Sequence, residues 1–386
     1  MSREGRKRKS NKSKSYFDYT LLFIVIFLVC FGLVMLYSVS SYEATLETGN
    51  SAYYLKKQMV STVIGFGAML IVTMLDYHIW KKFAYIAYAV SIISVLLVLT
   101  SLGIEVNGAR RWLNLGFSLQ PAEIAKAGMI VFFAFFICKM GKRIQTLKGV
   151  LTVLGLAAPV SGVVLIVTDN LSSAIIIFGI VLIMVFVATP NYKEYFLILG
   201  GIILVAAIFV LLVKKGVLTS EMSYRFGRIE AWLNPEAFSS TTGFQTLQAL
   251  YAIGSGELFG KGLGQSIQKL GFIPEAQNDM VFSIICEELG LFGASAVLLM
   301  FFLMIWRFFV VANNTEDMFG ALLVVGVMSH ISLQVIFNIA VVTNLIPNTG
   351  ITLPFISYGG SAVVFLLVEV GLVLSVSRNI RIKEVN

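Results

Sequence analysis

Charged side chains are scarce in this sequence. Only 13% of its 386 residues are charged, whereas 58% are apolar, and the mean hydropathy is +0.87. Soluble domains carry about 25% charged residues, so this composition excludes a soluble globular protein. It is typical of a chain that is surrounded mainly by lipid.

Cysteine and histidine are also few. The three cysteines, Cys30, Cys138 and Cys286, lie in apolar runs, and the two histidines, His78 and His330, are far apart. This pattern supports neither a disulfide framework nor a metal site. A Walker A sequence is absent, which argues against an ATP-driven pump, and so is the Asp-x-Asp pair with which nucleotide-sugar enzymes hold a metal. No cofactor is evident, and a divalent cation at a bound diphosphate is left open.

Long apolar runs dominate the sequence instead. Ten runs can cross a hydrocarbon core of about 30 Å, which takes roughly 17 to 25 helical residues. They lie at residues 19–37, 58–75, 83–104, 122–138, 150–168, 171–189, 195–213, 280–306, 319–342 and 358–377. The ~10-residue alternation of a membrane β-barrel is absent. The sequence therefore predicts an all-α polytopic membrane protein with ten transmembrane helices.

Basic residues predict the orientation of these helices. One side of the expected membrane collects 18 of the 29 lysines and arginines. They are Arg3, Arg6, Lys7, Arg8, Lys9, Lys12, Lys14, Lys81, Lys82, Lys139, Lys142, Arg143, Lys148, Lys193, Arg307, Arg378, Arg381 and Lys383. By the positive-inside rule this side, with both termini, is cytoplasmic. The net charge of +8 is mostly this signal, so nucleic-acid binding is not needed to explain it.

The predicted organisation has two tails and one large loop. Residues 1–18 form a basic cytoplasmic tail, residues 19–386 form a single transmembrane domain, and residues 378–386 are its short cytoplasmic end. Residues 214–278 form the large extracytoplasmic loop between the seventh and eighth helices. In it, Asn234 and Pro235 are typical of a helix start. Its glycines suit tight turns or a phosphate-binding nest: Gly254, Gly256, Gly260, Gly262 and Gly264.

One acid stands at the boundary between this loop and the membrane. Asp279 ends the polar loop, and the apolar run 280–306 follows at once. A carboxylate at that boundary can face water, a lipid head group and a protein cavity, which makes Asp279 the candidate for chemistry. Asp279 also suits the N-cap of the helix that follows, because Asp is favoured at helix N-termini and the helix dipole stabilises its charge there; the two roles are compatible.

Five stretches resemble a known family of membrane proteins. They are AIGSGELFGKGLGQS from Ala252, IPEAQNDMVFSIICEELG ending at Gly290, NGARRW from Asn107, QPAEIAK from Gln120 and TGITLPFISYGGS from Thr349. With these stretches in order along nearly the whole chain, the sequence resembles the SEDS family (shape, elongation, division and sporulation). Residues 262–269 are more similar to the family's division and sporulation members than to its elongation member.

The resemblance implies a function and partners. SEDS proteins are ten-helix peptidoglycan glycosyltransferases that polymerise lipid II at the outer face of the bacterial cytoplasmic membrane, with a class B penicillin-binding protein as transpeptidase. By resemblance we expect this activity here, with other divisome proteins and at the division septum. The family's catalytic acid falls on Asp279. Two stretches depart from the family pattern, namely residues 277–280, commonly His-Thr-Asp-Phe, and residues 168–173, often Pro-Asp-Leu-Gly-Thr.

Such a reaction needs a base. A sugar hydroxyl attacks the anomeric carbon of a polyprenyl-diphosphate sugar, and the diphosphate leaves. A positioned carboxylate that takes the hydroxyl proton contributes about 10²- to 10⁴-fold, and we assign this role to Asp279. A single carboxylate suits direct displacement, so we expect inversion at the anomeric carbon.

The leaving diphosphate also needs positive charge, and charged residues expected on the outer side are the substrate-binding candidates. They are Glu123, Lys126, Arg110, Arg111, Arg225, Arg228, Lys261 and Lys269. Glu123 and Lys126 lie three residues apart near the outer end of the run 122–138, so they can pair. The pair either orders the helix or shapes the cavity, with Lys126 reaching the diphosphate. The other basic residues suit phosphate or are merely solvated.

Several polar residues fall inside the apolar runs. They are Glu287, Glu288 and Glu369, together with a stripe of His330, Gln334 and Asn338 at intervals of four. For the stripe we favour hydrogen bonding between helices. The acids are either functional or packing groups.

Two other functions fit the same architecture. A lipid II flippase would grip the diphosphate and carry it across, so Asp279 would be dispensable as a base. A non-catalytic scaffold for a penicillin-binding protein would also tolerate loss of the Glu123–Lys126 pair. An acid beside a large outer loop favours the enzyme, because the interrupted helices of a transporter are not evident in both halves of the sequence.

Overall fold

The computed structural model describes residues 14–106, 108–114, 116–189, 192–217 and 224–382. Within them, nine helices are long and apolar enough to cross a membrane. They belong to α1 (Tyr19–Thr48), α2 (Tyr53–Met74), α3 (Trp80–Leu96, with short 3-10 turns at both ends), α4 (Pro121–Met140), α5 (Leu147–Thr168), α6 (Leu171–Ala188), α10 (Val281–Asn314), α11 (Met318–Val342) and α12 (Gly360–Arg378). The remaining predicted span corresponds to α7 (Tyr192–Lys214), whose apolar part, Ile198–Lys214, is shorter. The predicted polytopic helical fold is confirmed.

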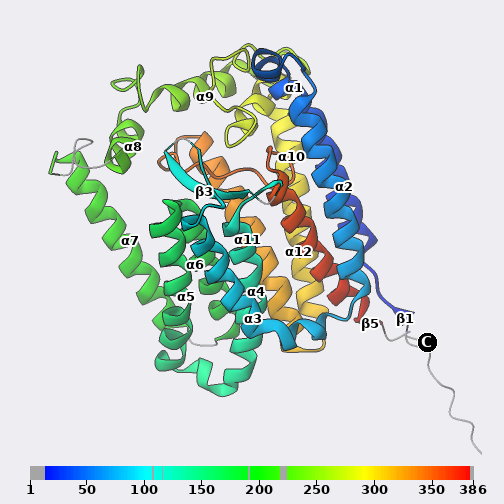
Figure 1. Ribbon diagram of the computed structural model, residues 1–386. Helices are drawn as coiled ribbons and strands as arrows, with labels where there is room; N and C mark the ends of the chain where they lie inside the picture. The colour runs from blue at the N-terminus through cyan, green and yellow to red at the C-terminus, as the bar shows by residue number, and fades with distance from the viewer. Residues whose placement is uncertain (1–13, 107, 115, 190–191, 218–223, 383–386) are drawn as a thin grey trace, which may run out of the picture.

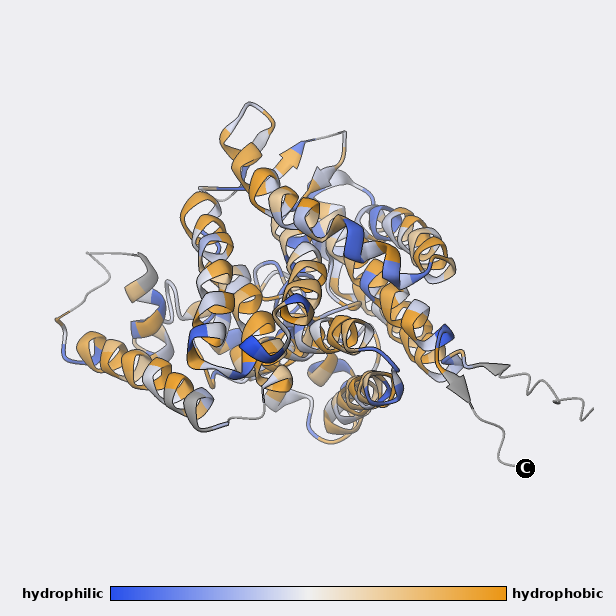
Figure 2. Ribbon diagram, turned by 90° about the horizontal axis from the view of Figure 1, so that it is seen from below, coloured by the Kyte–Doolittle hydropathy of each residue, from blue (hydrophilic) through white to orange (hydrophobic). Residues whose placement is uncertain are grey.

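Most of these helices form one bundle (Figure 1). Helix α2 packs along α12, α3 packs along α4, and α11 contacts α4, α6 and α10. Helices α11 and α12 are the most enclosed of the spans. Figure 2 shows that hydrophobic residues dominate the helical ribbons. This distribution is expected where lipid, rather than water, covers the outside of a bundle.

Helix α7 is arranged differently. It leans away from the bundle in Figure 1 and packs mainly against α8 (Tyr224–Leu233). Apolar side chains along it, such as Ile203, Leu204 and Val205, are largely exposed. A helix that exposes apolar side chains on its free surface suits contact with lipid.

A small antiparallel sheet lies between α3 and α4, where the sequence predicted the end of a helix and a loop. It consists of β2 (Gly103–Val106), β3 (Ala109–Asn114) and β4 (Ser118–Leu119), in that order. Val106 pairs with Ala109, and the connection between them ends in Gly108, whose φ is +74°. Positive φ is typical of tight hairpin turns. The predicted span 83–104 was therefore too long at its end, because residues 103–104 belong to the hairpin.

The predicted outer loop, residues 214–278, contains two helices among its described residues, α8 and α9 (Phe244–Ser255). The predicted helix start at Asn234 is wrong: Asn234 Oδ1 accepts a hydrogen bond from the Ala237 N–H at 3.4 Å, but residues 235–243 form turns. The loop glycines permit close backbone contact with α10, since a side chain at Gly256 or Gly260 would collide with α10 carbonyl groups. The predicted turns and close approach are thus present at these glycines.

The contact between this loop and α10 coincides with a break in the helix. Gly290 has φ +66° and ψ −167° in the middle of α10. The N–H groups of Lys261 and Gly262 donate to the carbonyls of Glu287 and Glu288, each at 2.9 Å. The loop therefore satisfies carbonyls that a continuous helix would satisfy itself, as required in a low-dielectric environment.

The two ends of the described chain lie side by side, away from α8 and α9 (Figure 1). Strand β1 (Lys14–Ser15) pairs with β5 (Arg381–Ile382). Next to them the Arg307 Nη2 group lies 2.8 Å from Asp18 Oδ2, and Asp18 is fully buried. An even number of spans predicts both ends on one side. Residues 1–13 of the predicted basic tail and residues 383–386 lie outside the described residues.

Candidate active site

Asp279 lies at the end of a series of turns that begins after α9 and leads into α10. The helix begins at Val281, and the residue at its N-cap position is Met280, with no side-chain capping bond. The interpretation of Asp279 as the N-cap of this helix is therefore wrong. Its carboxylate is left available for other contacts.

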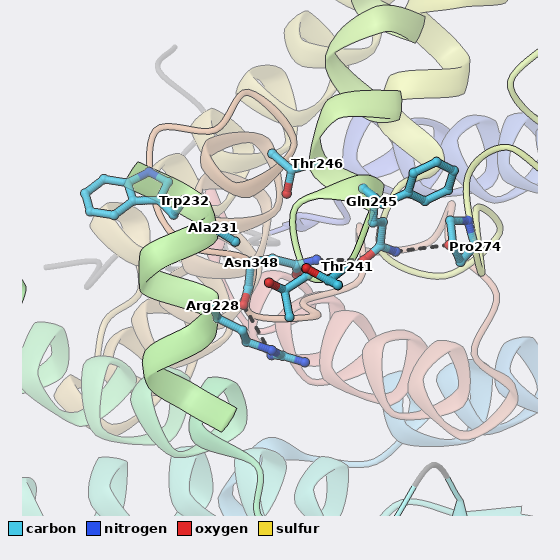
Figure 3. Close-up of a pocket in the computed structure, with 10 residues that line it drawn as sticks. Arg228, Ala231, Trp232, Thr241, Gln245, Thr246, Pro274 and Asn348 are labelled. Carbon is cyan, nitrogen blue, oxygen red and sulfur yellow. Dashed lines mark hydrogen bonds between the residues drawn. The ribbon is translucent and has the colours of Figure 1, made fainter. Parts of the chain in front are cut away.

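The carboxylate of Asp279 faces α9 and the segment that joins α11 to α12. Gln245 Nε2, on the first turn of α9, lies 3.5 Å from Asp279 Oδ1 and donates to the Pro274 carbonyl at 3.0 Å. Asn348 Nδ2 donates to Gln245 Oε1 at 2.8 Å. The Arg228 guanidinium, on α8, donates to the Asn348 carbonyl at 3.2 Å. These residues connect α8, α9, the turns before α10 and the segment between α11 and α12 into one polar network. Figure 3 shows the part of it formed by Arg228, Asn348, Gln245 and Pro274.

A cavity of about 280 Å³ opens beside this network. Its walls come from α8, the turns after α8, the start of α9, Pro274 and Asn348. Figure 3 shows Arg228 and Trp232 on one wall and Gln245 with Pro274 on the other. An aromatic face, an amide and a guanidinium form a lining that suits a polar ligand with both sugar-like and anionic parts.

Burial changes the acidity of Asp279. Part of its surface stays open, but the carboxyl is closely surrounded by protein, and this loss of hydration raises its pKa to about 7. The negative charge of Glu275 raises the pKa further, whereas the Asp279 backbone N–H and the positive charge of Arg228 oppose the rise. A carboxyl with a pKa near neutrality can both accept and release a proton at physiological pH.

The backbone of Asp279 is held separately from its side chain. Asn338, on α11, donates from Nδ2 to the Asp279 carbonyl at 2.7 Å, and from the same nitrogen to the Ile351 carbonyl at 2.7 Å. The Tyr358 N–H donates to the Gln277 carbonyl at 2.9 Å. The turn that carries Asp279 is therefore joined to the segment between α11 and α12.

Among the predicted substrate-binding residues, the structure brings Arg228 close to Asp279. Arg225 lies in the first turn of α8, and its side chain is outside the described part of the chain. Arg110 is exposed and lies 3.4 Å from Glu105 across the hairpin. Arg111 donates to the carbonyls of Thr168 and Asp169 at 3.1 and 3.0 Å. Arg111 therefore fastens the hairpin to the α5–α6 turn.

Lys261 and Lys269 are held by acids of α10. Lys261 Nζ lies 2.7 Å from Glu287 Oε1, and Lys269 Nζ lies 2.7 Å from Glu288 Oε1. Both carboxylates are fully buried, and so is nearly all of Lys269. These contacts fasten the outer loop to the bundle, and they occupy the two ammonium groups that were candidates for a diphosphate.

Glu123 and Lys126 form the predicted ion pair. Lys126 Nζ lies 2.8 Å from Glu123 Oε1 near the start of α4, and the two side chains are 2% and 5% exposed. Glu123 Oε2 has no hydrogen-bond partner among the described residues. The pair is enclosed within the bundle, and whether it takes part in substrate binding stays a prediction.

The residues that sequence analysis missed are neutral. Gln245, Asn348 and Trp232 carry no charge and no motif that marks them as functional. Asn338 was included only as part of a polar stripe on α11. The predicted hydrogen bond between helices is present for His330, which lies 2.7 Å from Glu369 on α12, whereas Asn338 reaches the Asp279 carbonyl, which lies outside any helix. Periodicity could have suggested that Asn338 faces the interior, but not what it contacts.

No group of three or more His, Cys, Asp or Glu side chains in the described ranges is close enough to hold a metal ion.

The architecture and the acid before the first turn of α10 define a polytopic membrane protein with a polar site at one end of its helices. Residues 19–382 match the family described as "Cell cycle protein", FtsW/RodA/SpoVE. The chain belongs to this family, which confirms the resemblance found in its motifs.

Relatives of the family cover nearly the whole chain. The sequence is 38% identical to stage V sporulation protein E of Bacillus subtilis, over 94% of this chain and 97% of that protein. It is 36% identical to a probable peptidoglycan glycosyltransferase FtsW of Trichlorobacter lovleyi, over 95% of this chain and 94% of that protein.

Solved structures agree with the fold. One is a chain from a structure described as "Structural coordination of polymerization and crosslinking by a peptidoglycan synthase complex", with 27% identity and a TM-score of 0.78 over 94% of this chain and 98% of that one. The other is the rod shape determining protein RodA of Thermus thermophilus, with 27% identity and a TM-score of 0.67 over 94% of this chain and 97% of that one.

Proposed function

We propose that this protein is a peptidoglycan glycosyltransferase that polymerises lipid II at the outer face of the bacterial cytoplasmic membrane. The observation that carries the proposal is Asp279, a carboxyl whose pKa is raised to about 7 and which lies 3.5 Å from Gln245, one of the residues that line the cavity. Family membership and similarity to proteins named peptidoglycan glycosyltransferase FtsW supply the class of substrate.

In the proposed reaction Asp279 acts as general base. The hydroxyl of an acceptor sugar attacks the anomeric carbon of the donor sugar, and Asp279 takes the hydroxyl proton as the new glycosidic bond forms. The bond between the anomeric carbon and the diphosphate oxygen breaks, and the diphosphate leaves with the electron pair. With a pKa near 7 the carboxyl is largely ionised just above neutrality, yet basic enough to accept a proton.

Arg228 is the cation that we assign to the diphosphate. It lines the cavity, and its charge acts on Asp279, so a diphosphate that accumulates negative charge near the acid lies within its field. Arg225, one turn from Arg228 on α8, is a second candidate. The location at the end of a membrane helix suits a substrate whose polyprenyl tail stays in the bilayer while its sugars lie in the loop region.

The proposal includes partners and a place of action. A class B penicillin-binding protein would crosslink the strands, which agrees with the similarity to a chain of a peptidoglycan synthase complex. Similarity to proteins named FtsW favours action at the division septum with other divisome proteins.

The test is polymerisation of lipid II by the purified protein, together with its class B partner, with crosslinking blocked by a β-lactam. Wild type, Asp279→Asn and the control Glu257→Gln are compared; Glu257 is an exposed acid in the same outer loop. We expect glycan strands from wild type and control, and none from a folded Asp279→Asn protein. Equal strands from all three would remove Asp279 as the base. An inactive wild type that moves lipid II across vesicles would establish the flippase instead.

A further inference from the structure

Asn338 has a fully buried side-chain amide whose nitrogen donates hydrogen bonds to two backbone carbonyls. Its Nδ2 atom lies 2.7 Å from the carbonyl oxygen of Asp279 and 2.7 Å from that of Ile351. Its Oδ1 atom is buried with no hydrogen-bond partner among the described residues. The side chain is therefore used as a double donor, a role that needs both N–H bonds of a primary amide.

The two carbonyls belong to segments that are far apart in sequence. Asp279 ends the outer loop before α10, and Ile351 lies in the segment between α11 and α12. Asn338 projects from α11, one of the most enclosed helices of the bundle. One side chain on a helix thus contacts the backbone of both segments. A functional group that is held by a helix is positioned more accurately than one held by a loop.

The segment around Ile351 also faces the carboxylate of Asp279. Asn348 holds Gln245, whose Nε2 lies 3.5 Å from Asp279 Oδ1. A side chain at Gly350 would begin 3.8 Å from Asp279 Oδ2. The distance between the carboxylate and this segment therefore depends on how the Asp279 and Ile351 backbones are placed relative to one another. Asn338 contacts both backbones directly, and the Tyr358 N–H bond to the Gln277 carbonyl joins the same two segments nearby.

We propose that Asn338 is a positioning residue for the acid: its carboxamide holds the backbone of Asp279 against the segment around Ile351, so that the carboxylate is aimed at the substrate hydroxyl. This inference rests on the proposed function, in which Asp279 is the base. It assigns Asn338 no contact with the substrate.

A positioning role has a distinct kinetic result. Misplacement of a catalytic group by about 1 Å can cost roughly 10²-fold in rate. Substrate binding uses other groups and should change little. A role in stability alone would lower the folded fraction and leave the turnover of folded molecules unchanged.

The experiment compares Asn338→Leu, which keeps the size but cannot donate, and Asn338→Gln, which keeps the amide on a longer stem. The matched control is Gln334→Leu, one turn earlier on α11. Gln334 is a similarly buried amide, and its nearest donor contact, at 3.4 Å, is with Thr352 Oγ1 rather than with Asp279. For each variant the kcat and KM for lipid II are measured per folded molecule, with the thermal unfolding temperature alongside.

We expect kcat to fall by about 10- to 100-fold in Asn338→Leu, with KM within about threefold of wild type. Asn338→Gln should recover part of kcat, and Gln334→Leu should stay near wild type. Lipid II should bind equally well to Asp279→Asn with and without Asn338→Leu, since neither change removes a substrate contact.

Three results would overturn the inference while the proposed function stands. They are wild-type kcat in Asn338→Leu, an equal loss in Gln334→Leu, and loss of lipid II binding on adding Asn338→Leu to Asp279→Asn. If Asn338→Leu does not fold, Asn338→Gln is compared with Gln334→Leu instead. Wild-type kcat in Asn338→Gln, or an equal loss of kcat in both variants, would then overturn the inference. Failure of the proposed function is a separate result, namely no strands from the wild type.

Discussion

Asp279 lies just before α10, and Glu287 and Glu288 lie in its first turns, but the surroundings of their carboxylates differ. Glu288 is fully buried and faces Lys269 Nζ at 2.7 Å and the Ser38 hydroxyl at 2.7 Å. Glu287 is also fully buried and faces Lys261 Nζ at 2.7 Å. The side-chain donor that faces Asp279 is the Gln245 amide, at the longer distance of 3.5 Å.

The difference separates a structural acid from a reactive one. A buried charge that is paired and hydrogen-bonded stays ionised and holds its surroundings together. A carboxyl that loses water without gaining strong donors has a raised pKa, and its basicity is available for a proton transfer. The loop supplies the lysines that pair with the structural acids of α10, whereas its own last acid, Asp279, has no such cation within ion-pair distance among the described residues.

Asp279→Asn tests the reactive side of this comparison and has the largest expected effect. The polymerisation rate should fall by about 10²- to 10⁴-fold, because the general base is lost. The thermal unfolding temperature at pH 7 should be equal to or above that of wild type, since the burial that raises the pKa of Asp279 disfavours its charged form. A large fall in the unfolding temperature would place Asp279 among the structural acids.

Lys269→Met tests whether the buried ion pair between Lys269 and Glu288 stabilises the fold. It leaves the buried carboxylate of Glu288 without its cation, and breaking a buried pair in this way costs about 3–5 kcal/mol. Thermal unfolding in detergent should show the loss. The double variant Lys269→Met with Glu288→Leu should recover most of it, because no unpaired charge remains. If the single variant is as stable as wild type, the pair does not fasten the loop.

Lys261→Met should have a smaller effect of the same kind. The Lys261 side chain is 31% exposed, and Glu287 also accepts hydrogen bonds from the N–H groups of Ile267 and Gln268 at 3.2 and 3.3 Å. Loss of one hydrogen bond to a charged group costs about 1.5–3 kcal/mol. The same unfolding measurement applies, and a loss larger than that of Lys269→Met would reverse the order expected from burial.

The pH dependence of polymerisation gives the smallest and most specific test. Only ionised Asp279 can act as base, so the rate should rise with pH through about 7 and then level off. Arg228 lowers the pKa of Asp279, so Arg228→Met should move this rise to higher pH; Glu275 raises it, so Glu275→Gln should move the rise to lower pH. The shift in the pKa of Asp279 should by itself alter the rate at pH 7 by less than about tenfold in each variant.

The position of the pH-dependent rise, not the plateau rate, is the relevant measurement. Arg228 is also proposed to contact the diphosphate, so its loss can lower the plateau independently. A rise that stays in place in both variants would mean that the titrating group is not Asp279.

Much of the fold could be predicted from the sequence because the membrane imposes simple requirements. Span length follows from bilayer thickness, and apolar runs such as 150–168 and 319–342 agree with α5 and α11 to within a few residues. The hairpin after α3 was missed because its residues are partly apolar and short strands carry little periodicity. The end of α1 at Thr48 was also missed, because the helix continues beyond its apolar run into more polar residues.

The candidate site was only partly predictable. Asp279 could be identified because an acid next to an apolar run is conspicuous, and Arg228 because it is basic. Lys261 and Lys269 looked equivalent to Arg228 in the sequence, since exposure and partners are not encoded in residue type. Gln245 could not be identified, because a neutral amide in a loop carries no signal of its own.

The sequence by itself therefore determined the class of protein, the spans and the acid at the membrane boundary, since hydropathy and length act locally along the chain. Only the tertiary structure decided which cation faces which acid and which amide reaches the backbone of Asp279. These contacts join α11, the outer loop and the segment before α12, which are far apart in sequence. Their distances depend on how the whole bundle packs, and no local pattern specifies them.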